Sequence, residues 1–509
     1  MSQQEKLFDQ FPPVTTKEWM DKITADLKGA DFDKKLVWKT KEGFNVKPFY
    51  RKEDTEILPF IDSLPGDFPY IRGNRKNGNS WFIRQNIEVT DYQEANKKAL
   101  DILMKGIDSL GFVINDPDSI NEKNINSLLK DIHFESVEIN FLSNGKAKEL
   151  LENVITAFSK TDSVLSKIKG SVEADPLGRL MINGTLCIPV ESGLDYLASL
   201  TEMASSLPHF RTIRVNGSSF TNAGCDIVKE LALSLSMANE YMSQLTGRGI
   251  SSDLAASKIC FNFGTGSNYF FEIAKLRAAR LLWAMVVSAY ESKDAESSIM
   301  NINSITSKWN KTVYDPYVNL LRTQTEAMSA ALGGCDSLTV EPFDIVFRQP
   351  DEFSERLARN QQLILKEEAY FDKTADPGGG SYYIENLTSM IADSCWKLFI
   401  EIENHGGFLT SLKKGFIQNL IKESAAIRKS DILKKKEILL GTNLYPDSNE
   451  ILSLTVDYGK IISTKTDNVD NLVEPVNLFR GSEELDTLRF ESPDLFIIEY
   501  GSGKDKPCE

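Results

Sequence analysis

Imidazole is the side chain best suited to acid–base and metal chemistry near neutral pH, and this chain carries only three of them. They are His133, His209 and His405. Their spacing gives no HExxH pattern and no cluster of imidazole ligands, so the sequence predicts no histidine-based metal site. Any histidine-dependent chemistry must use one of these three residues.

Thiols offer no alternative metal or redox centre. The six cysteines are scattered along the chain, and no two of them form a CxxC pair. We therefore expect reduced, mostly buried side chains and neither a zinc ribbon nor a disulfide framework. They are Cys187, Cys225, Cys260, Cys335, Cys395 and Cys508.

A few residues could contact a phosphate. The segment from Gly264 to Gly266 is a weak phosphate-loop signal on its own, and the Gly378–Gly380 run can be only a flexible turn. Arg72 and Arg84 could bind phosphate oxygens, but Arg84 could equally serve packing or a salt bridge.

The net charge of the chain argues against some classes of binding partner. The 509 residues carry a net charge of -15, which disfavours a nonspecific electrostatic grip on nucleic acid or anionic lipid, although a local basic channel for a phosphate stays open. Apolar stretches such as 281–289 are far shorter than the roughly 20 residues that cross a bilayer, and MSQQEKLFDQ has no apolar signal-peptide core. We expect a cytoplasmic protein that binds neither nucleic acid nor membrane.

The elements that must position these residues alternate between strand and helix. Between about 85 and 406, short β-rich runs are separated by longer helical segments, which predicts parallel strands. A spacing of roughly 30 to 45 residues per strand favours a (β/α)8 barrel over an open doubly wound sheet. The β-rich runs are GFVI (111–114), VEINFL (137–142), IKGSVE (168–173), RTIRVN (211–216) and KICFNF (258–263), and the clearest helices are 225–245, 271–292 and 353–370.

The N-terminal segment has a different pattern. Thr15 and Glu18 have capping-box spacing, and apolar residues recur every four positions after them, which predicts a short amphipathic helix. The following LVWKTKEGFNVKPFY (36–50) alternates around Gly43 and predicts a strand-turn-strand arm. An arm this apolar needs a surface to pack on.

Four segments match a known family in the same order along the chain. They are LPGDFPYIRGNRKNGNSWFIRQ (64–85), FGTGSNYFFEIAKLRAARLLWA (263–284), NLLRTQTEAMSAALGGCDSL (319–338) and ERLARNQQLILKEEAYFDKTADPGGGSYYIENLT (355–388). Together with WKTKEGFNVKPFY (38–50) and GTNLYP (441–446), they make nearly the whole chain similar to methylmalonyl-CoA mutases. The resemblance implies a (β/α)8 barrel and a radical rearrangement of acyl-CoA that starts by homolysis of the cobalt–carbon bond of adenosylcobalamin.

The same resemblance shows where catalytic groups are replaced. Catalytic chains of the family carry a TMY tyrosine before W.IRQ, whereas only NRKNGNS (74–80) stands there. Their SGYH run, whose histidine hydrogen-bonds the thioester carbonyl, becomes NGSSFTNAG (216–224), with Ser218 at the tyrosine and Ser219 at the histidine. A serine hydroxyl cannot reach as far as an imidazole.

At two further positions the chain also lacks the side chain that catalytic chains of the family carry. In SVEADPLG (171–178), Glu173 takes the place of a substrate-binding glutamine, and its negative charge suits an acyl carboxylate poorly. In SLTVEPFD (337–344), Thr339 stands where catalytic chains have a histidine. We therefore expect no catalytic, cofactor-binding or metal-binding residue in this chain.

The cobalamin site of the family also has no counterpart. The resemblance implies a cobalt-ligating D-x-H-x-x-G histidine in a separate C-terminal domain. Asp131 and His133 begin such a pattern, but Ser136 replaces the glycine, and we interpret the match as chance. RGSEELDTLR (480–489) resembles the segment that precedes the cobalamin domain in longer relatives. We expect adenosylcobalamin to be held by a partner chain.

The resemblance is therefore to the small, non-catalytic subunit of a heterodimeric mutase, whose large subunit interconverts (R)-methylmalonyl-CoA and succinyl-CoA. We expect an arm that contacts the partner in 1–50, a degenerate barrel in 51–406 and a helical extension in 407–509. Two alternatives are a catalytic chain that borrows a separately encoded cobalamin-binding chain, and an acyl-CoA-binding or regulatory module. The missing tyrosine and histidine argue against the first, and retained basic groups at the barrel mouth would favour the second.

Overall fold

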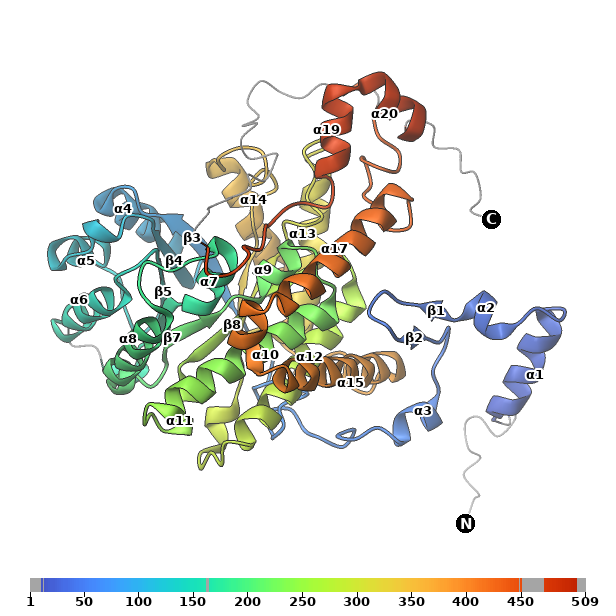
Figure 1. Cartoon of the computed structure of the whole chain (residues 1–509), viewed down its shortest axis with the longest axis horizontal. Coiled ribbons are helices and arrows are strands. Elements are labelled where there is room, and N and C mark those ends of the chain that lie inside the picture. The colour runs from blue at the N-terminus through green and yellow to red at the C-terminus, as the bar shows by residue number, and fades with distance from the viewer. Residues whose placement is uncertain (1–10, 12, 162–163, 448, 451–470, 501–509) are drawn as a thin grey trace, which may run out of the picture.

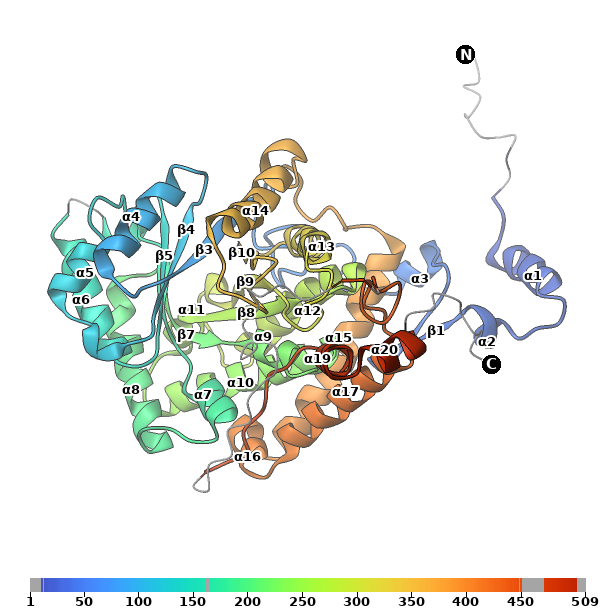
Figure 2. The ribbon, with the colours of Figure 1, turned by 90° about the horizontal axis from the view of Figure 1, so that it is seen from above.

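The fold is a closed barrel of eight parallel strands surrounded by helices (Figure 1; Figure 2). The computed structural model describes residues 11, 13–161, 164–447, 449–450 and 471–500. The strands follow one another around the barrel in chain order, and β10 closes it by pairing with both β9 and β3. They are β3 (Phe82–Glu88), β4 (Ser109–Ile114), β5 (Glu138–Ser143), β6 (Gly170–Ala174), β7 (Phe210–Val215), β8 (Ile259–Thr265), β9 (Asn301–Thr306) and β10 (Ser337–Thr339).

The predicted (β/α)8 barrel is confirmed. The five β-rich runs become β4 to β8, each within two residues of its predicted ends. The helix predicted at 225–245 is α10 (Ile227–Gly247), and the one at 271–292 is α12 (Tyr269–Ser288). The helix predicted at 353–370 is shorter, because α14 (Glu352–Leu363) passes into a π-helical turn at Ile364–Glu368.

The remaining helices of the barrel lie between and around the strands. They are α4 (Tyr92–Leu103), α5 (Glu122–Leu128), α6 (Ala147–Ser159), α7 (Pro176–Asn183), α8 (Val190–Met203), α9 (Gly217–Asn222), α11 (Ser252–Ser257), α13 (Val318–Leu332) and α15 (Tyr382–Asn404). The main apolar core contains strand residues such as Leu110, Phe112 and Phe141, each fully buried. No helix in the described part of the chain is long and apolar enough to cross a membrane.

The interior of the barrel is polar. Barrels of this class are usually filled by layers of branched apolar side chains. Here Ser171 Oγ donates to Asn140 Oδ1 at 2.7 Å, and Asn140 Nδ2 donates to Ser109 Oγ at 3.1 Å. The neighbouring strands β4, β5 and β6 are therefore joined inside the barrel by side-chain hydrogen bonds, since each buried polar group needs a partner.

The predicted N-terminal helix and arm are present. Helix α1 (Thr16–Asp26) begins with the capping box formed by Thr15 and Glu18. Strands β1 (Trp38–Lys39) and β2 (Asn45–Val46) pair antiparallel around Gly43, whose φ of +91° favours glycine. Helices α1 and α2 (Phe32–Leu36) project away from the barrel in both views, whereas α3 (Lys52–Glu56) packs on α15 (Figure 1; Figure 2).

The described part of the chain after the barrel contains further helices. Helices α16 (Gly407–Lys413), α17 (Phe416–Leu433), α19 (Glu483–Glu491) and α20 (Pro493–Tyr500) follow α15. This region is attached to the C-terminal end of β9, because Gly481 N donates to Trp309 O at 2.8 Å and Arg480 Nη1 donates to Lys311 O at 3.3 Å.

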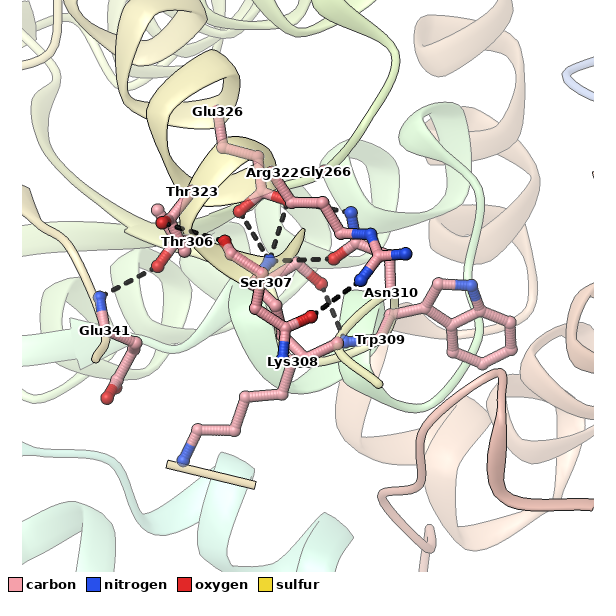
Figure 3. A network of polar contacts seen from close by, with 12 residues as sticks. Gly266, Thr306, Ser307, Lys308, Trp309, Asn310, Arg322, Thr323, Glu326 and Glu341 are labelled. Atoms are coloured by element: carbon pink, nitrogen blue, oxygen red, sulfur yellow. Dashed lines mark hydrogen bonds and ion pairs between the residues drawn. The ribbon is translucent and has the colours of Figure 1, made fainter. Parts of the chain in front are cut away.

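A buried ion pair supports that attachment. Lys311 Nζ lies 2.7 Å from both carboxylate oxygens of Glu326 on α13, and Asn310 Nδ2 donates to the same carboxylate at 2.7 Å. Figure 3 shows Asn310 and Glu326 within this network. Both members of the pair are buried, and burial lowers the pKa of Lys311 and raises that of Glu326.

Removing one member of this pair should destabilise the fold. Lys311→Met leaves the Glu326 carboxylate buried without a counter-ion, and the expected loss in the free energy of unfolding is about 3–5 kcal/mol. Guanidinium unfolding measures this loss. The double variant Lys311→Met, Glu326→Leu should recover most of it, since no charge then stays buried.

The matched control is Lys22→Met, which breaks an exposed pair with Asp26 on α1. Its free energy of unfolding should change by no more than about 0.5 kcal/mol. If Lys311→Met costs no more than this control, the pair does not support the attachment.

Candidate functional site

The four positions singled out in the sequence all lie near the C-terminal ends of strands, where barrel enzymes place their active sites. Glu173 is the next-to-last residue of β6, and Thr339 is the last residue of β10. Ser218 and Ser219 lie in α9, directly after β7. All four are buried.

Ser218 and Ser219 are held by two asparagines. Ser218 Oγ donates to Asn216 Oδ1 at 2.8 Å, and Asn216 Nδ2 donates to Ser219 Oγ at 2.9 Å. Asn262 of β8 adds hydrogen bonds from its Nδ2 to Asn216 Oδ1 at 2.8 Å and to Ser218 Oγ at 3.1 Å. Each hydroxyl is thus bonded to an amide, and neither has a base within this group that could take its proton.

Thr339 of β10 belongs to the same network through β9, the strand between β8 and β10. Asn303 Nδ2 on β9 donates to Asn262 Oδ1 at 2.6 Å, and Asn303 Oδ1 accepts from Ser337 Oγ at 2.9 Å and from Thr339 Oγ1 at 3.4 Å. The structure therefore brings Ser218, Ser219 and Thr339 together through neutral amides. Such a network fixes side chains but supplies no group with a pKa near neutrality.

Glu173 lies in a separate ion cluster. Its Oε1 accepts from Arg84 Nη2 at 2.9 Å, and its Oε2 lies 2.7 Å from Arg214 Nη1. Burial by itself raises the pKa of the Glu173 carboxyl, but the charges of Arg214 and Arg84 outweigh burial and hold that pKa below its ordinary 4.5. We call Arg84, Glu173 and Arg214 the ion triad.

The ion triad spans the barrel, because its members come from β3, β6 and β7. Arg84 and Glu173 are almost completely buried, and Arg214 is largely so. A carboxylate that accepts a hydrogen bond from one arginine and forms an ion pair with a second is held by both cations, and its lowered pKa makes it a poor proton acceptor. Arg84 was a predicted salt-bridge candidate because it lies in the W.IRQ element, whereas no motif or spacing indicated Arg214.

A pocket opens above the ion triad at the C-terminal ends of β5, β6 and β7. Its volume is about 660 Å³, and Glu173, Arg214, Asn216 and Ser219 contribute to its lining. Its other walls are largely apolar and include Leu142, Ile182, Leu186, Ile188, Tyr196 and Leu197. We call this the upper pocket, and its size and lining suit a small organic ligand.

None of the three histidines reaches the upper pocket. His133 and His209 precede β5 and β7 and so lie at the N-terminal end of the barrel. His405 follows α15, where its Nδ1 lies 2.8 Å from Glu401 O and its ring stacks on Phe416 with centroids 4.1 Å apart.

The loop 74–80 also lies at the N-terminal end of the barrel. Asn74 Nδ2 donates to Met300 O at 2.8 Å, just before β9, and Arg75 pairs with Asp336 at 3.1 Å, just before β10. The structure therefore does not bring this loop together with Ser218, Ser219, Glu173 and Thr339.

Comparison with known proteins gives a consistent family. The family model for methylmalonyl-CoA mutase matches residues 39–122 and 118–492. The chain is 44% identical, over 98% of its length and 81% of the relative's, to a methylmalonyl-CoA mutase small subunit of Porphyromonas gingivalis. It is 34% identical to a methylmalonyl-CoA mutase of Cereibacter sphaeroides and 32% identical to the human mitochondrial enzyme, covering 86% and 89% of this chain. It spans only 65% and 64% of the length of these two relatives.

The ion triad should make stability depend on pH. At neutral pH, Glu173→Gln leaves two arginines around a neutral amide, and the expected loss in the free energy of unfolding is about 3–5 kcal/mol. Because the folded-state pKa of Glu173 is lowered, its contribution is present above the ordinary value of 4.5 and is lost as the pH falls through the folded-state pKa. Unfolding midpoints of both proteins, measured from neutral to acidic pH, should therefore converge at the acidic end.

Glu56→Gln is the matched control, since Glu56 forms an exposed pair with Lys52 on α3. Its free energy of unfolding should stay within about 0.5 kcal/mol of the wild-type value at every pH. A Glu173→Gln protein that is as stable as this control at neutral pH would contradict the role assigned to the ion triad.

Proposed function

Because the chain belongs to the methylmalonyl-CoA mutase family, we propose that it is a non-catalytic small subunit. In this proposal it supports a larger catalytic chain, in a cytoplasmic heterodimer, in the interconversion of (R)-methylmalonyl-CoA and succinyl-CoA. The relative that is named a small subunit supports this assignment through its 44% identity.

The chemistry at the C-terminal end of the barrel carries the proposal. The groups at the four positions singled out in the sequence are hydroxyls bonded to amides, and a carboxylate paired with two arginines. A general acid or base needs a pKa near the working pH and a free path to the substrate, and none of these groups has both. The ion triad also separates the upper pocket from the lower half of the barrel, since Glu173 and Arg214 line cavities on both sides.

The described residues do not fit a cobalamin site. In this family cobalt is coordinated by a histidine, and the chain's three histidines lie at the N-terminal end of the barrel or after α15. A cobalt ligand would have to approach the opposite, C-terminal end, where the upper pocket opens. We therefore assign adenosylcobalamin, and the radical it supplies when bound, to the partner chain.

The N-terminal arm is the proposed contact with that partner. Helix α1 has no buried residue and leaves Trp19 46% exposed, although its spacing is that of an amphipathic helix. Trp38 of β1 is likewise half exposed while it contacts Phe271. Burying such side chains against a partner would stabilise both chains by linkage.

A binding or regulatory role is the second candidate, and the upper pocket favours it. A pocket of about 660 Å³ with apolar walls could hold an acyl group even where no reaction follows. A ligand there would enter from the C-terminal side, because the ion triad closes the barrel axis below. The other alternative, a catalytic chain that uses a separately encoded cobalamin-binding chain, has less support. It would need a reactive group at the C-terminal end of the barrel in place of the missing tyrosine and histidine.

Mutase assays test the main proposal. With adenosylcobalamin present, this chain alone should show no turnover, and a mixture with the large chain from the same genome should be active. If this chain is active with only a separate cobalamin-binding chain, it is itself the catalytic chain. A large chain that is stable and fully active by itself would contradict the supporting role.

The proposed contact can be tested at one residue. Trp19→Ala should weaken association with the large chain by about tenfold or more, because an aromatic anchor is lost from the interface. Lys22→Ala on the same helix is the control, since that side chain is 74% exposed and should contribute little. Sedimentation or calorimetric titration measures both, and equal affinities for the two variants would exclude α1 from the interface.

A further inference from the structure

A second pocket lies between the N-terminal arm and the helical region that follows the barrel. Its volume is about 480 Å³, and its lining includes residues 38–42 of the arm and Ile427, Arg428 and Asp431 of α17. The remaining walls come from the start of α10 and from the loops that follow β8 and β9. We call it the arm pocket, and it shares no lining residue with the upper pocket.

The arm pocket is acidic where its walls are buried. Its lining contains six carboxylates and four cations. Two of the cations, Lys41 and Arg428, pair with the same carboxylate, and the other two, Lys39 and Lys436, are exposed. The fully buried charged groups of the lining are therefore all carboxylates, and they are Asp226, Glu230 and Glu272.

Two of these buried carboxylates share one counter-ion. Lys275 Nζ lies 2.7 Å from Glu230 Oε2 and 2.6 Å from Glu272 Oε2, and all three side chains are buried. Burial raises the pKa of the Glu230 carboxyl, Lys275 opposes this effect, and the charge of Glu272 raises the pKa further. Burial, and then the charge of Asp226, raise the pKa of Glu42 on the arm. The contributions of Glu272 and Asp226 indicate a negative potential that a bound cation would relieve.

The same wall contains a hydroxyl without a partner. Thr221 Oγ1 lies beside Glu230, but no described group stands in hydrogen-bonding geometry to it, although Thr221 is only 7% exposed. Buried polar side chains in folded proteins nearly always have a hydrogen-bond partner. Glu42 and Asp431 also line the pocket, and neither forms an ion pair within the described part of the chain. The pocket therefore offers oxygen acceptors to a ligand that can donate hydrogen bonds.

The lining favours an organic cation over a metal ion. Among the described residues, no group of three or more His, Cys, Asp or Glu side chains is placed to hold a metal ion. The volume of the arm pocket is that of a small-molecule site. Trp38, Ile227 and Ile427 add apolar surface to the lining, and aromatic rings beside carboxylates are suited to an ammonium group with a carbon chain.

From this arrangement we infer that the arm pocket binds a primary alkylammonium ion. Its ammonium group lies in the acidic part of the pocket, where it donates to Thr221 Oγ1 and offsets the charge of Glu230 and Glu272. Its carbon chain packs on the apolar part of the lining. Because the arm, the barrel and α17 all contribute to the lining, the ligand joins these three parts of the chain. This inference does not depend on the proposed function.

Calorimetric titration of the full-length chain with butylammonium chloride, at an ionic strength held constant with sodium chloride, tests the inference. We expect saturable binding at one site. Thr221→Val keeps the shape of the side chain but removes the hydroxyl, so it should weaken binding by about tenfold or more. Thr221→Ser restores the hydroxyl and should bind more tightly than Thr221→Val. Thr156→Val is the matched control, since it removes an exposed hydroxyl on α6 and should leave the affinity unchanged.

Absence of saturable butylammonium binding would overturn the inference, and so would equal affinities of wild type and Thr221→Val. Butylammonium should also raise the melting temperature of the wild-type chain by linkage, which keeps the test valid if Thr221→Val does not fold. An unchanged melting temperature would count against the site. Tetramethylammonium, which cannot donate a hydrogen bond, is the second probe. Weaker binding than butylammonium supports the contact with Thr221, and equal or tighter binding contradicts it.

Discussion

The ion pairs of Glu173 with Arg84 and Arg214 are the interaction on which the rest of the barrel depends. Two guanidinium groups inside a barrel cannot stay unpaired, because desolvating a charge without a counter-ion costs several kcal/mol. The single carboxylate between them satisfies both at 2.9 Å and 2.7 Å. It also joins β3, β6 and β7 across the barrel and closes the barrel axis below the upper pocket.

Closing the axis has a functional consequence. Above the ion triad, Ser218, Ser219 and Thr339 bond the side-chain amides of neighbouring residues, and hydroxyls and amides have no pKa near neutrality. A mutase of this family needs groups that hold a thioester while a radical rearranges it. The four positions compared with catalytic chains hold instead hydroxyls bonded to amides and a carboxylate paired with two arginines, and this is the physical basis for proposing a supporting role.

Much of the fold could be predicted from the sequence because apolar residues recur regularly along most strands and helices. β4 to β8 each contain apolar or β-branched residues, and α10 and α12 carry long apolar stretches. No such signal marks β9, whose NINSIT is mostly polar, or β10, which is only three residues long. The end of α14 was placed too late because a π-helical turn keeps a helical sequence pattern.

The site was predictable only in part. Motif comparison located Ser218, Ser219, Glu173 and Thr339, and the structure places all four near the C-terminal ends of strands. Their partners Arg214, Asn262 and Asn303 lie on different strands, and pairing across a barrel depends on register, which sequence spacing does not contain. The assignment of these positions as lost catalytic groups stays a proposal.

The most direct test of that assignment uses the assembled complex. This chain, carrying Ser218→Ala, Ser219→Ala and Thr339→Val together, is combined with an unmodified large chain, and mutase turnover per complex is measured. If the barrel is structural, turnover should stay within about twofold of wild type, since no proton or substrate contact is removed. A fall of about a hundredfold or more, the size of a lost acid–base group, would show that this barrel takes part in the chemistry.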